Sequence, residues 1–146
     1  KSILDIGLTL EYLETQGVPV LGYQTEDFPA FYTRESGYKA DYSIESPQLM
    51  AKVIADKWNM KLKGGVVIGN PIPKEHELEP AFINKSIEEA LEKAEAGGIK
   101  GKKVTPFLLD YLKSATKGDS LAANIELVYN NARVGSQIAV ELAKLD

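Results

Sequence analysis

The sequence has 146 residues, of which 44% are hydrophobic and 26% charged, and its formal net charge is −4. These values are typical of one globular domain and exclude an intrinsically disordered chain. The chain has no cysteine, which excludes disulfides, thiolate nucleophiles and cysteine metal sites and is compatible with the cytoplasm, our expected location. The acidic balance disfavours a nucleic-acid polymer as partner, and the lack of about 18 consecutive apolar residues argues against a membrane partner.

The first third of the chain predicts a helix followed by two short strands. Ser2 is the expected N-cap, with Asp5 as the acid of a capping box, and apolar residues then recur at helical spacing. Gly17 is the expected end of that helix. The apolar run 18–22 has the length of a strand, and residues 42–44 predict a short edge strand.

The next segment predicts a second helix and a buried strand. Ser46 is the expected N-cap and Pro47 the first residue of a helix that runs to about Met60. Four side chains of this helix are expected in the core, namely Met50, Val53, Ile54 and Trp58. Residues 66–68 form an unbroken β-branched run, which is typical of a strand buried on both faces. The segment 70–73 is predicted to turn.

The second half of the chain predicts three helices. Ser86 with Glu89 resembles a capping box, and the helix that it opens is expected to reach Glu95. Thr105-Pro106 is the expected start of the next helix. Asp119 or Ser120 is expected to cap a long final helix with an apolar stripe. The stripe is predicted to consist of Leu121, Ile125, Val128, Ala132, Ile138 and Leu142.

This order of elements predicts an α/β fold, because strands alternate with helices in the first half. We expect an α/β/α layered sandwich to which this chain supplies only part of the sheet plus several helices. Two or three strands do not make a stable doubly covered sheet. A helical pattern also starts at once after Lys1, so the remaining strands are expected in an upstream half.

Two charged features carry little chemistry. His76 is the only histidine, flanked by Glu75 and Glu77, and adjacent residues do not close around one metal ion as i, i+4 pairs do. A surface loop is its expected place. The acidic residues of the segment 88–95 alternate with lysines, which is typical of a solvated helix face rather than a carboxylate site.

Three segments allow a functional interpretation beside a structural one. Lys1 precedes a capped helix, whose positive dipole favours the neutral amine that carbonyl chemistry needs, although a terminal lysine is usually disordered. The loop 69–73 follows a strand, where α/β proteins bind ligands, or it is an ordinary turn. The segment 105–107 opens a helix and so provides an anion site or a simple cap.

Asparagines on the last helix form a further candidate. Asn124 stands near the start of this helix, where asparagine is a poor helix-interior residue. Asn131 follows two turns later on the same face, beside Asn130. Such amides offer a donor and an acceptor that read a base edge, or they are buried amides satisfied by a neighbouring loop. The residues leave both interpretations open.

Several long strings of this sequence resemble one known family. They are KSILDIGLTLEYLETQGVPVLGYQTEDFPAFY, ESGYKADYSIESP, GNPIP, GKKVTPFLL and GDSLAANIELVYNNARVGSQIA. They resemble the pseudouridine-5′-phosphate glycosidase family, also called the indigoidine synthase A-like family. The resemblance covers essentially the whole chain and implies that residues 1–146 are the C-terminal half of a single glycosidase-like domain.

The resemblance implies an enzyme reaction. Family members reversibly cleave the carbon–carbon glycosidic bond of pseudouridine 5′-phosphate and give uracil and ribose 5-phosphate. A C-glycoside has no heteroatom leaving group, so the resemblance implies that the bond breaks with formation of a Schiff base between a lysine and the sugar C1′. By alignment, Lys1 is implied to be the Schiff-base lysine and Asn124 the asparagine that contacts and positions the base.

The other parts of the implied active site lie outside this chain. The family's general-acid glutamate, a second lysine, the phosphate-binding residues and the aspartate linked to a divalent metal, usually Mn²⁺, are all upstream. The resemblance therefore implies that the isolated chain is inactive and that its partners are the N-terminal half of the same protein and, in a homotrimer, further copies.

Two alternatives remain at this point. The chain is a catalytically incomplete fragment with only a binding or assembly role, to which the aromatic loop 28–32 contributes an interface unless it packs inside the subunit. Alternatively, it belongs to a related glycosidase of pigment biosynthesis.

Overall fold

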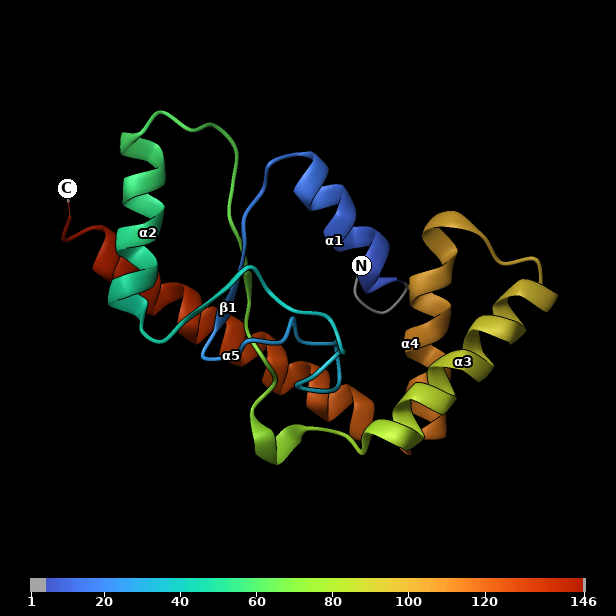
Figure 1. Ribbon diagram of the computed structural model, residues 1–146. Helices are drawn as coiled ribbons and strands as arrows, with labels where there is room; N and C mark the ends of the chain where they lie inside the picture. The colour runs from blue at the N-terminus through green and yellow to red at the C-terminus, as the bar shows by residue number, and fades with distance from the viewer. Residues whose placement is uncertain (1–4, 146) are drawn as a thin grey trace.

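The structure is a computed structural model that describes residues 5–145 (Figure 1). Its sheet has three parallel strands in the order β2-β1-β3, in which Leu21 of β1 lies opposite Tyr42 on one side and Ile68 on the other. The strands are β1 (Val20–Tyr23), β2 (Tyr42–Ile44) and β3 (Val67–Gly69). Val20 and Leu21 are adjacent in the chain and both buried, so the central strand is covered on both faces.

Five α-helices accompany the sheet within the described residues. They are α1 (Ile6–Thr15), α2 (Pro47–Asn59), α3 (Pro80–Ala96), α4 (Val104–Ala115) and α5 (Asp119–Leu142), with short 3₁₀ helices η1 (Lys74–His76) and η2 (Gly101–Lys103). The expected α/β fold, with part of a sheet and several helices, is confirmed. No helix in the described range is long and apolar enough to cross a membrane.

Helix α5 joins two hydrophobic clusters. Its C-terminal part packs with α2 on the sheet, in a cluster of Leu21, Ile44, Met50, Ile54, Val134 and Ile138. Its N-terminal part packs against the hairpin of α3 and α4, in a cluster that includes Ile83, Leu108, Leu112, Ala123 and Leu127. In Figure 1 the sheet and α2 lie toward one end of α5 and the hairpin lies toward the other. The long helix therefore holds the two parts of the chain together.

Two predicted helix ends are confirmed, and one helix start is different. Gly17 ends α1 with a φ of +64°, and Ser46 caps α2 by accepting a hydrogen bond from the Leu49 N–H, with Pro47 as the first helical residue. Ser2 lies outside the described residues. Asp5 is itself the N-cap of α1, because its backbone is extended and its carboxylate accepts from the Leu8 N–H.

One large side chain of α2 that was predicted to be buried is exposed. Met50 and Ile54 are buried and Val53 is half-buried, but Trp58 is 52% exposed. The neighbouring Lys57 is only 7% exposed instead, since its ammonium group binds the backbone that follows the helix. A lysine with three acceptors is satisfied in the core, which periodicity does not reveal.

The start of α3 was predicted seven residues too late, with Ser86 rather than Glu79 as the N-cap. The helix begins at Pro80, after Glu79, whose carboxylate accepts hydrogen bonds from the Ala81 and Phe82 N–H groups. Ser86 lies inside the helix, buried, and donates its hydroxyl to the Phe82 carbonyl. The capping-box pattern at Ser86 was therefore misleading, because a serine can satisfy itself within a helix in this way.

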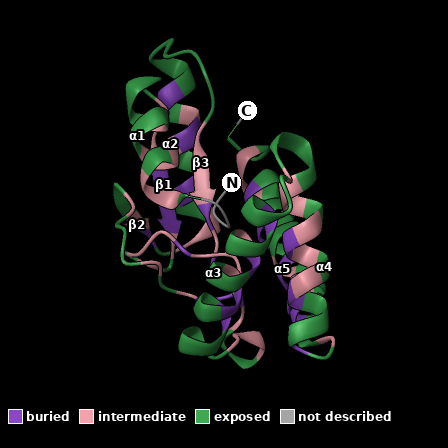
Figure 2. Cartoon of the chain, turned by 90° about the vertical axis from the view of Figure 1, so that its right-hand side faces the viewer, coloured by how far each residue is buried: buried purple, intermediate pink, exposed green. Residues whose placement is uncertain are grey.

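The predicted buried stripe of α5 is largely wrong. The residues buried on this helix are Ser120, Ala123, Leu127, Val134 and Ile138. Leu121, Ile125 and Val128 are exposed, Val128 to 55%. Figure 2 shows the exposed side of α5 beside its buried side. Both sides of this helix are rich in apolar residues, so its pattern alone does not choose the face that packs.

The strand β3 is less buried than its β-branched run predicted. Val66, Val67 and Ile68 are half-buried rather than fully buried. In the described part of the chain β3 pairs with β1 on one side, and no strand pairs with its other side.

Candidate functional site

The segments that follow β1 and β3 meet at one edge of the sheet. Because the two strands are parallel, their carboxyl ends point the same way, and this edge is where α/β folds place their ligands. The segment after β1 runs from residue 24 to 41 with one isolated bridge, between Asp27 and Lys39. Loops of this length without regular structure are uncommon and are often functional.

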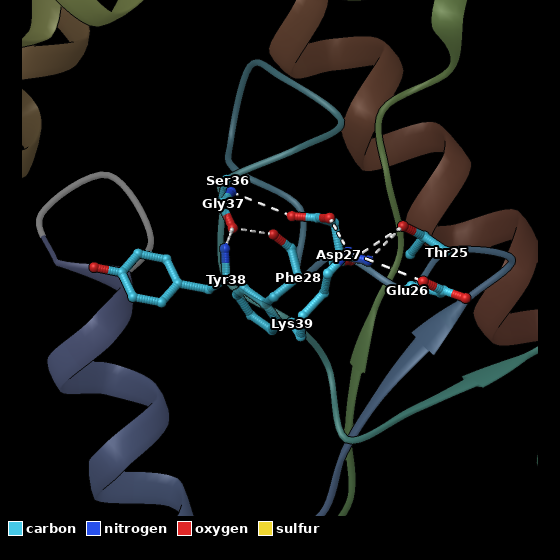
Figure 3. Close-up of polar contacts among 8 residues, drawn as sticks. All are labelled: Thr25, Glu26, Asp27, Phe28, Ser36, Gly37, Tyr38 and Lys39. Atoms are coloured by element: carbon cyan, nitrogen blue, oxygen red, sulfur yellow. Dashed lines mark hydrogen bonds and ion pairs between the residues drawn. The ribbon is translucent and has the colours of Figure 1, made fainter.

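The loop 24–41 is held in shape by Asp27 (Figure 3). The Asp27 carboxylate accepts from Lys39 Nζ at 2.9 Å and from the Gly37 N–H at 3.2 Å. The lysine's hydrogen bond lowers the pKa of Asp27 below its usual value and raises that of Lys39. Ser36 donates its hydroxyl to the Phe28 carbonyl, and the Phe28 N–H donates to the Tyr38 carbonyl. The ring of Tyr38 points toward the first turn of α1.

The two segments are locked to each other. Gly69 at the end of β3 lies so close to Pro29 that a Cβ on it would stand 2.8 Å from the proline Cδ. Arg34 donates its Nη1 to the Ile72 carbonyl at 2.6 Å, and its backbone N–H donates to the Glu77 carboxylate at 2.7 Å. The loop 24–41 and the segment 70–79 therefore form one body.

Three asparagine amides connect this body to α5. Asn70, directly after β3, donates its Nδ2 to the Asn131 Oδ1 at 2.9 Å. Asn130 donates its Nδ2 to the Pro71 carbonyl at 3.2 Å and, with a longer contact of 3.4 Å, to the Asn70 Oδ1. The loop 69–73 and Asn131, both singled out in the sequence, are thus brought together, and part of their role is to bind each other.

Two hollows lie on α5 beside these segments. One, of about 300 Å³, lies between Phe28–Phe31, the strand end at Asn70 and the α5 residues Asn131 and Gly135. The other, of about 200 Å³, lies between α4 and α5 and is lined by Asn124, Lys113 and Asp110 together with Tyr32 and Ser120. The half-buried Asn124 therefore faces an open space rather than a filled core.

Tyr32 was not singled out by the sequence as a site residue. It is 3% exposed, and burial raises the pKa of its hydroxyl, while a hydrogen bond from Ser120 partly offsets that rise. Tyr32 and the neighbouring Phe31 pack against the hydrophobic cluster of α3 to α5. For the loop 28–32 this favours packing inside the chain over an exposed interface.

The other candidate residues from the sequence are Lys1, His76 and Thr105. Lys1 lies outside the described residues. His76 is partly exposed in η1, with its Nε2 3.8 Å from a Glu126 carboxylate oxygen, as expected for a surface histidine. Thr105 is the second residue of α4, which begins at Val104 rather than being capped by Thr105. Between residues 5 and 145 no group of three or more His, Asp or Glu side chains is placed to hold a metal ion.

Comparison with known proteins places this geometry in a family. The sequence profile described as "Indigoidine synthase A like protein" matches residues 1–141. A pseudouridine-5′-phosphate glycosidase of Caldanaerobacter subterraneus subsp. tengcongensis is 61% identical over 145 residues, which are 99% of this chain and 47% of that protein. One of Clostridium botulinum is 58% identical over 146 residues, which are all of this chain and 48% of that protein.

A solved structure has the same fold. The prealnumycin C-glycosynthase AlnA, in complex with ribulose 5-phosphate, matches 99% of this chain and 48% of its own with a TM-score of 0.89 and 34% identity. The chain spans about half the length of the curated relatives that it matches. Identity of this level over the strands, the locked loops and α5 shows that the chain belongs to the indigoidine synthase A-like family.

Proposed function

We propose that the complete protein, of which this chain is about half, reversibly cleaves pseudouridine 5′-phosphate to uracil and ribose 5-phosphate. The observation that carries this proposal is the identity of 58% and 61% with proteins named pseudouridine-5′-phosphate glycosidase, over at least 99% of this chain. The other half of the protein is the required partner.

Lys1 is the proposed nucleophile. Its amine bonds to the sugar C1′ while the bond from C1′ to the ring oxygen breaks. The nitrogen lone pair then forms the C1′=N Schiff base as the bond from C1′ to the base carbon breaks, and the base takes up a proton. Water releases ribose 5-phosphate and restores the amine. The proton donor is a proposed upstream glutamate.

Asn124 is the proposed contact to the uracil base. Its neutral amide carries both a donor and an acceptor, which matches the alternating carbonyl and N–H groups of a pyrimidine edge. Its half-buried position on an open hollow supports this role. A charged side chain there would cost more to desolvate against a neutral base.

The metal, the oligomer and the location follow from the same family. A divalent cation such as Mn²⁺ would take its ligands from the upstream half, since the described residues offer no cluster for it. No step above depends on that ion. We propose a homotrimer, and a cytoplasmic location because both phosphorylated substrates are charged.

A related reaction is the second candidate. The fold is shared with a C-glycosynthase, an enzyme named for forming rather than breaking a carbon–glycosyl bond. The same lysine chemistry run in reverse would join ribose 5-phosphate to another aromatic carbon, as in pigment biosynthesis. The lower identity of 34%, against 58% and 61% for the glycosidases, favours uracil as the base.

The test is product analysis with the complete protein. Incubation with pseudouridine 5′-phosphate should release uracil, detected by mass spectrometry, and borohydride with ribose 5-phosphate should trap a reduced sugar adduct on Lys1. Lys1→Ala should abolish both. Uracil release by Lys1→Ala would overturn the lysine assignment, and no uracil from the wild type would overturn the substrate. If the wild type releases no uracil, the remaining alternatives are a binding or assembly role, or a reaction on a base other than uracil.

A further inference from the structure

The Asn70 side chain joins the end of β3 to two consecutive residues of α5. Its Nδ2 donates to Asn131 and its Oδ1 accepts from Asn130, which also holds the Pro71 carbonyl. Contacts to two adjacent helical residues, about 100° apart around the helix axis, restrain both sliding and rotation of the helix. A single contact would restrain neither fully.

We call Asn70, Asn130 and Asn131 with these hydrogen bonds the asparagine clamp. The part of the clamp that follows β3 is held rigidly. Asn70 is followed by Pro71, which limits the backbone of both residues, and Pro71 and Ile72 are buried. On the other side, Gly69 is pressed against Pro29 of the loop after β1. The three amides are therefore anchored to the body formed by the two locked segments.

Asn124 lies on the same helix, six to seven residues before the clamp. At 1.5 Å per residue this is about 10 Å along one unbroken helix, over which a rotation at the clamp is transmitted nearly unchanged. One other described contact between the segment after β3 and α5 is the partly exposed pair of His76 and Glu126 at 3.8 Å, which is weak.

We propose that Asn70 is a positioning residue, which sets the rotation of α5 and thereby the direction in which the Asn124 amide meets the base. This inference rests on the proposed function. Asn70 would act indirectly, because its contacts are with α5 and not with the reacting atoms. Loss of these hydrogen bonds should therefore weaken the binding of uracil and leave the binding of ribose 5-phosphate unchanged.

The experiment measures synthesis of pseudouridine 5′-phosphate by the complete protein, because this direction gives separate KM values for uracil and ribose 5-phosphate. Asn70→Ala should raise the uracil KM about tenfold and leave the ribose 5-phosphate KM within about twofold. Asn70→Asp should raise the uracil KM less than Asn70→Ala, since its carboxylate loses the donor to Asn131 but still accepts from Asn130. Asn131→Ala removes that one hydrogen bond from an exposed position, should Asn70→Ala fail to fold.

A double-mutant cycle separates positioning from general damage. In an Asn124→Ala background, Asn70→Ala should change the uracil KM by less than about twofold, because the group that it positions is gone. Glu126→Gln is the matched control. It removes the charge from a second polar contact between the same two segments, and its KM values should equal those of the wild type.

Each of the following results would overturn the inference while leaving the proposed function in place. They are a wild-type uracil KM in the folded Asn70 and Asn131 variants, or equal changes with and without Asn124. A parallel rise of both KM values in each Asn70 variant would show a purely structural role. Failure of the wild type to make or cleave the nucleotide would instead overturn the proposed function and this inference with it.

Discussion

A single carboxylate organises the loop after the central strand. Asp27 lies near the start of that loop and binds Lys39 and the Gly37 backbone near its end, and the contact with Lys39 lowers its pKa. A group whose pKa is lower in the folded than in the unfolded chain stabilises the fold when it is ionised. The contribution of Asp27 is therefore present above about pH 4 and is lost as the pH falls through its lowered pKa.

Acid should therefore loosen the loop 24–41 before the rest of the chain. Limited pepsin digestion of the complete protein between pH 5 and pH 2 should show cleavage in this loop as the pH drops below about 4. In Asp27→Asn the same cleavage should occur already at pH 5. Asp110→Asn, at an exposed carboxylate on α4, is the control and should follow the wild type. An unchanged pattern in Asp27→Asn would contradict this account.

At the scale of elements, α2 is linked to β3 by a buried lysine. Lys57 Nζ donates to the carbonyls of Leu62, Lys63 and Gly64 at 3.2, 2.7 and 3.2 Å. These carbonyls belong to the turn that leads the chain from the helix into the strand. The ammonium group thus replaces water as the partner of three backbone acceptors.

Lys57→Met should destabilise the complete protein by about 1–3 kcal/mol, since it keeps the apolar stem but removes three hydrogen bonds made by a charged donor. Urea unfolding followed by tryptophan fluorescence would report this, because Trp58 is the next residue. Lys52→Met is the control on the exposed side of the same helix and should change the free energy of unfolding by less than about 0.5 kcal/mol. Equal unfolding curves for the two variants would refute the role of Lys57.

At the scale of the whole molecule, α5 has an uncovered apolar face. Leu121, Ile125, Val128 and Tyr129 are exposed on a helix with only four charged residues among its 24. Together with the open edge of β3, this face is of the kind that soluble proteins cover. We expect the proposed upstream half to pack on this face, since the chain spans about half the length of its relatives.

The two halves, produced as separate chains in one cell, should therefore associate through α5. Val128→Asp would bury an unpaired carboxylate and should lower the amount of recovered complex at least about tenfold, measured by co-purification. Glu92→Gln on the exposed, charged face of α3 should leave recovery unchanged. Full recovery with Val128→Asp would show that another surface joins the halves.

The accuracy of the sequence predictions follows the range of the interactions involved. The Ser46 cap and the Gly17 helix end were predicted because each depends on neighbours within a few residues. Ser86 misled because one local pattern fits both a helix start and a serine inside a helix. Lys57 was missed because its three acceptors lie beyond the helix that carries it.

The same distinction holds for the candidate site. The family to which the chain belongs was recognisable from the sequence, because it rests on residues in a fixed order. The role of Asn124 stays a prediction. The partnership of Asn70 with Asn130 and Asn131 was not recognisable, since about 60 residues of the chain separate Asn70 from the other two.

By itself, the sequence determined the succession of strands and helices, some of their ends and the family, since these depend on residue order and short-range contacts. The tertiary structure decided which face of α5 is buried and which loops are locked together. Those outcomes depend on what packs against each surface. For a helix that is apolar on both sides, only the position of its neighbours makes that choice.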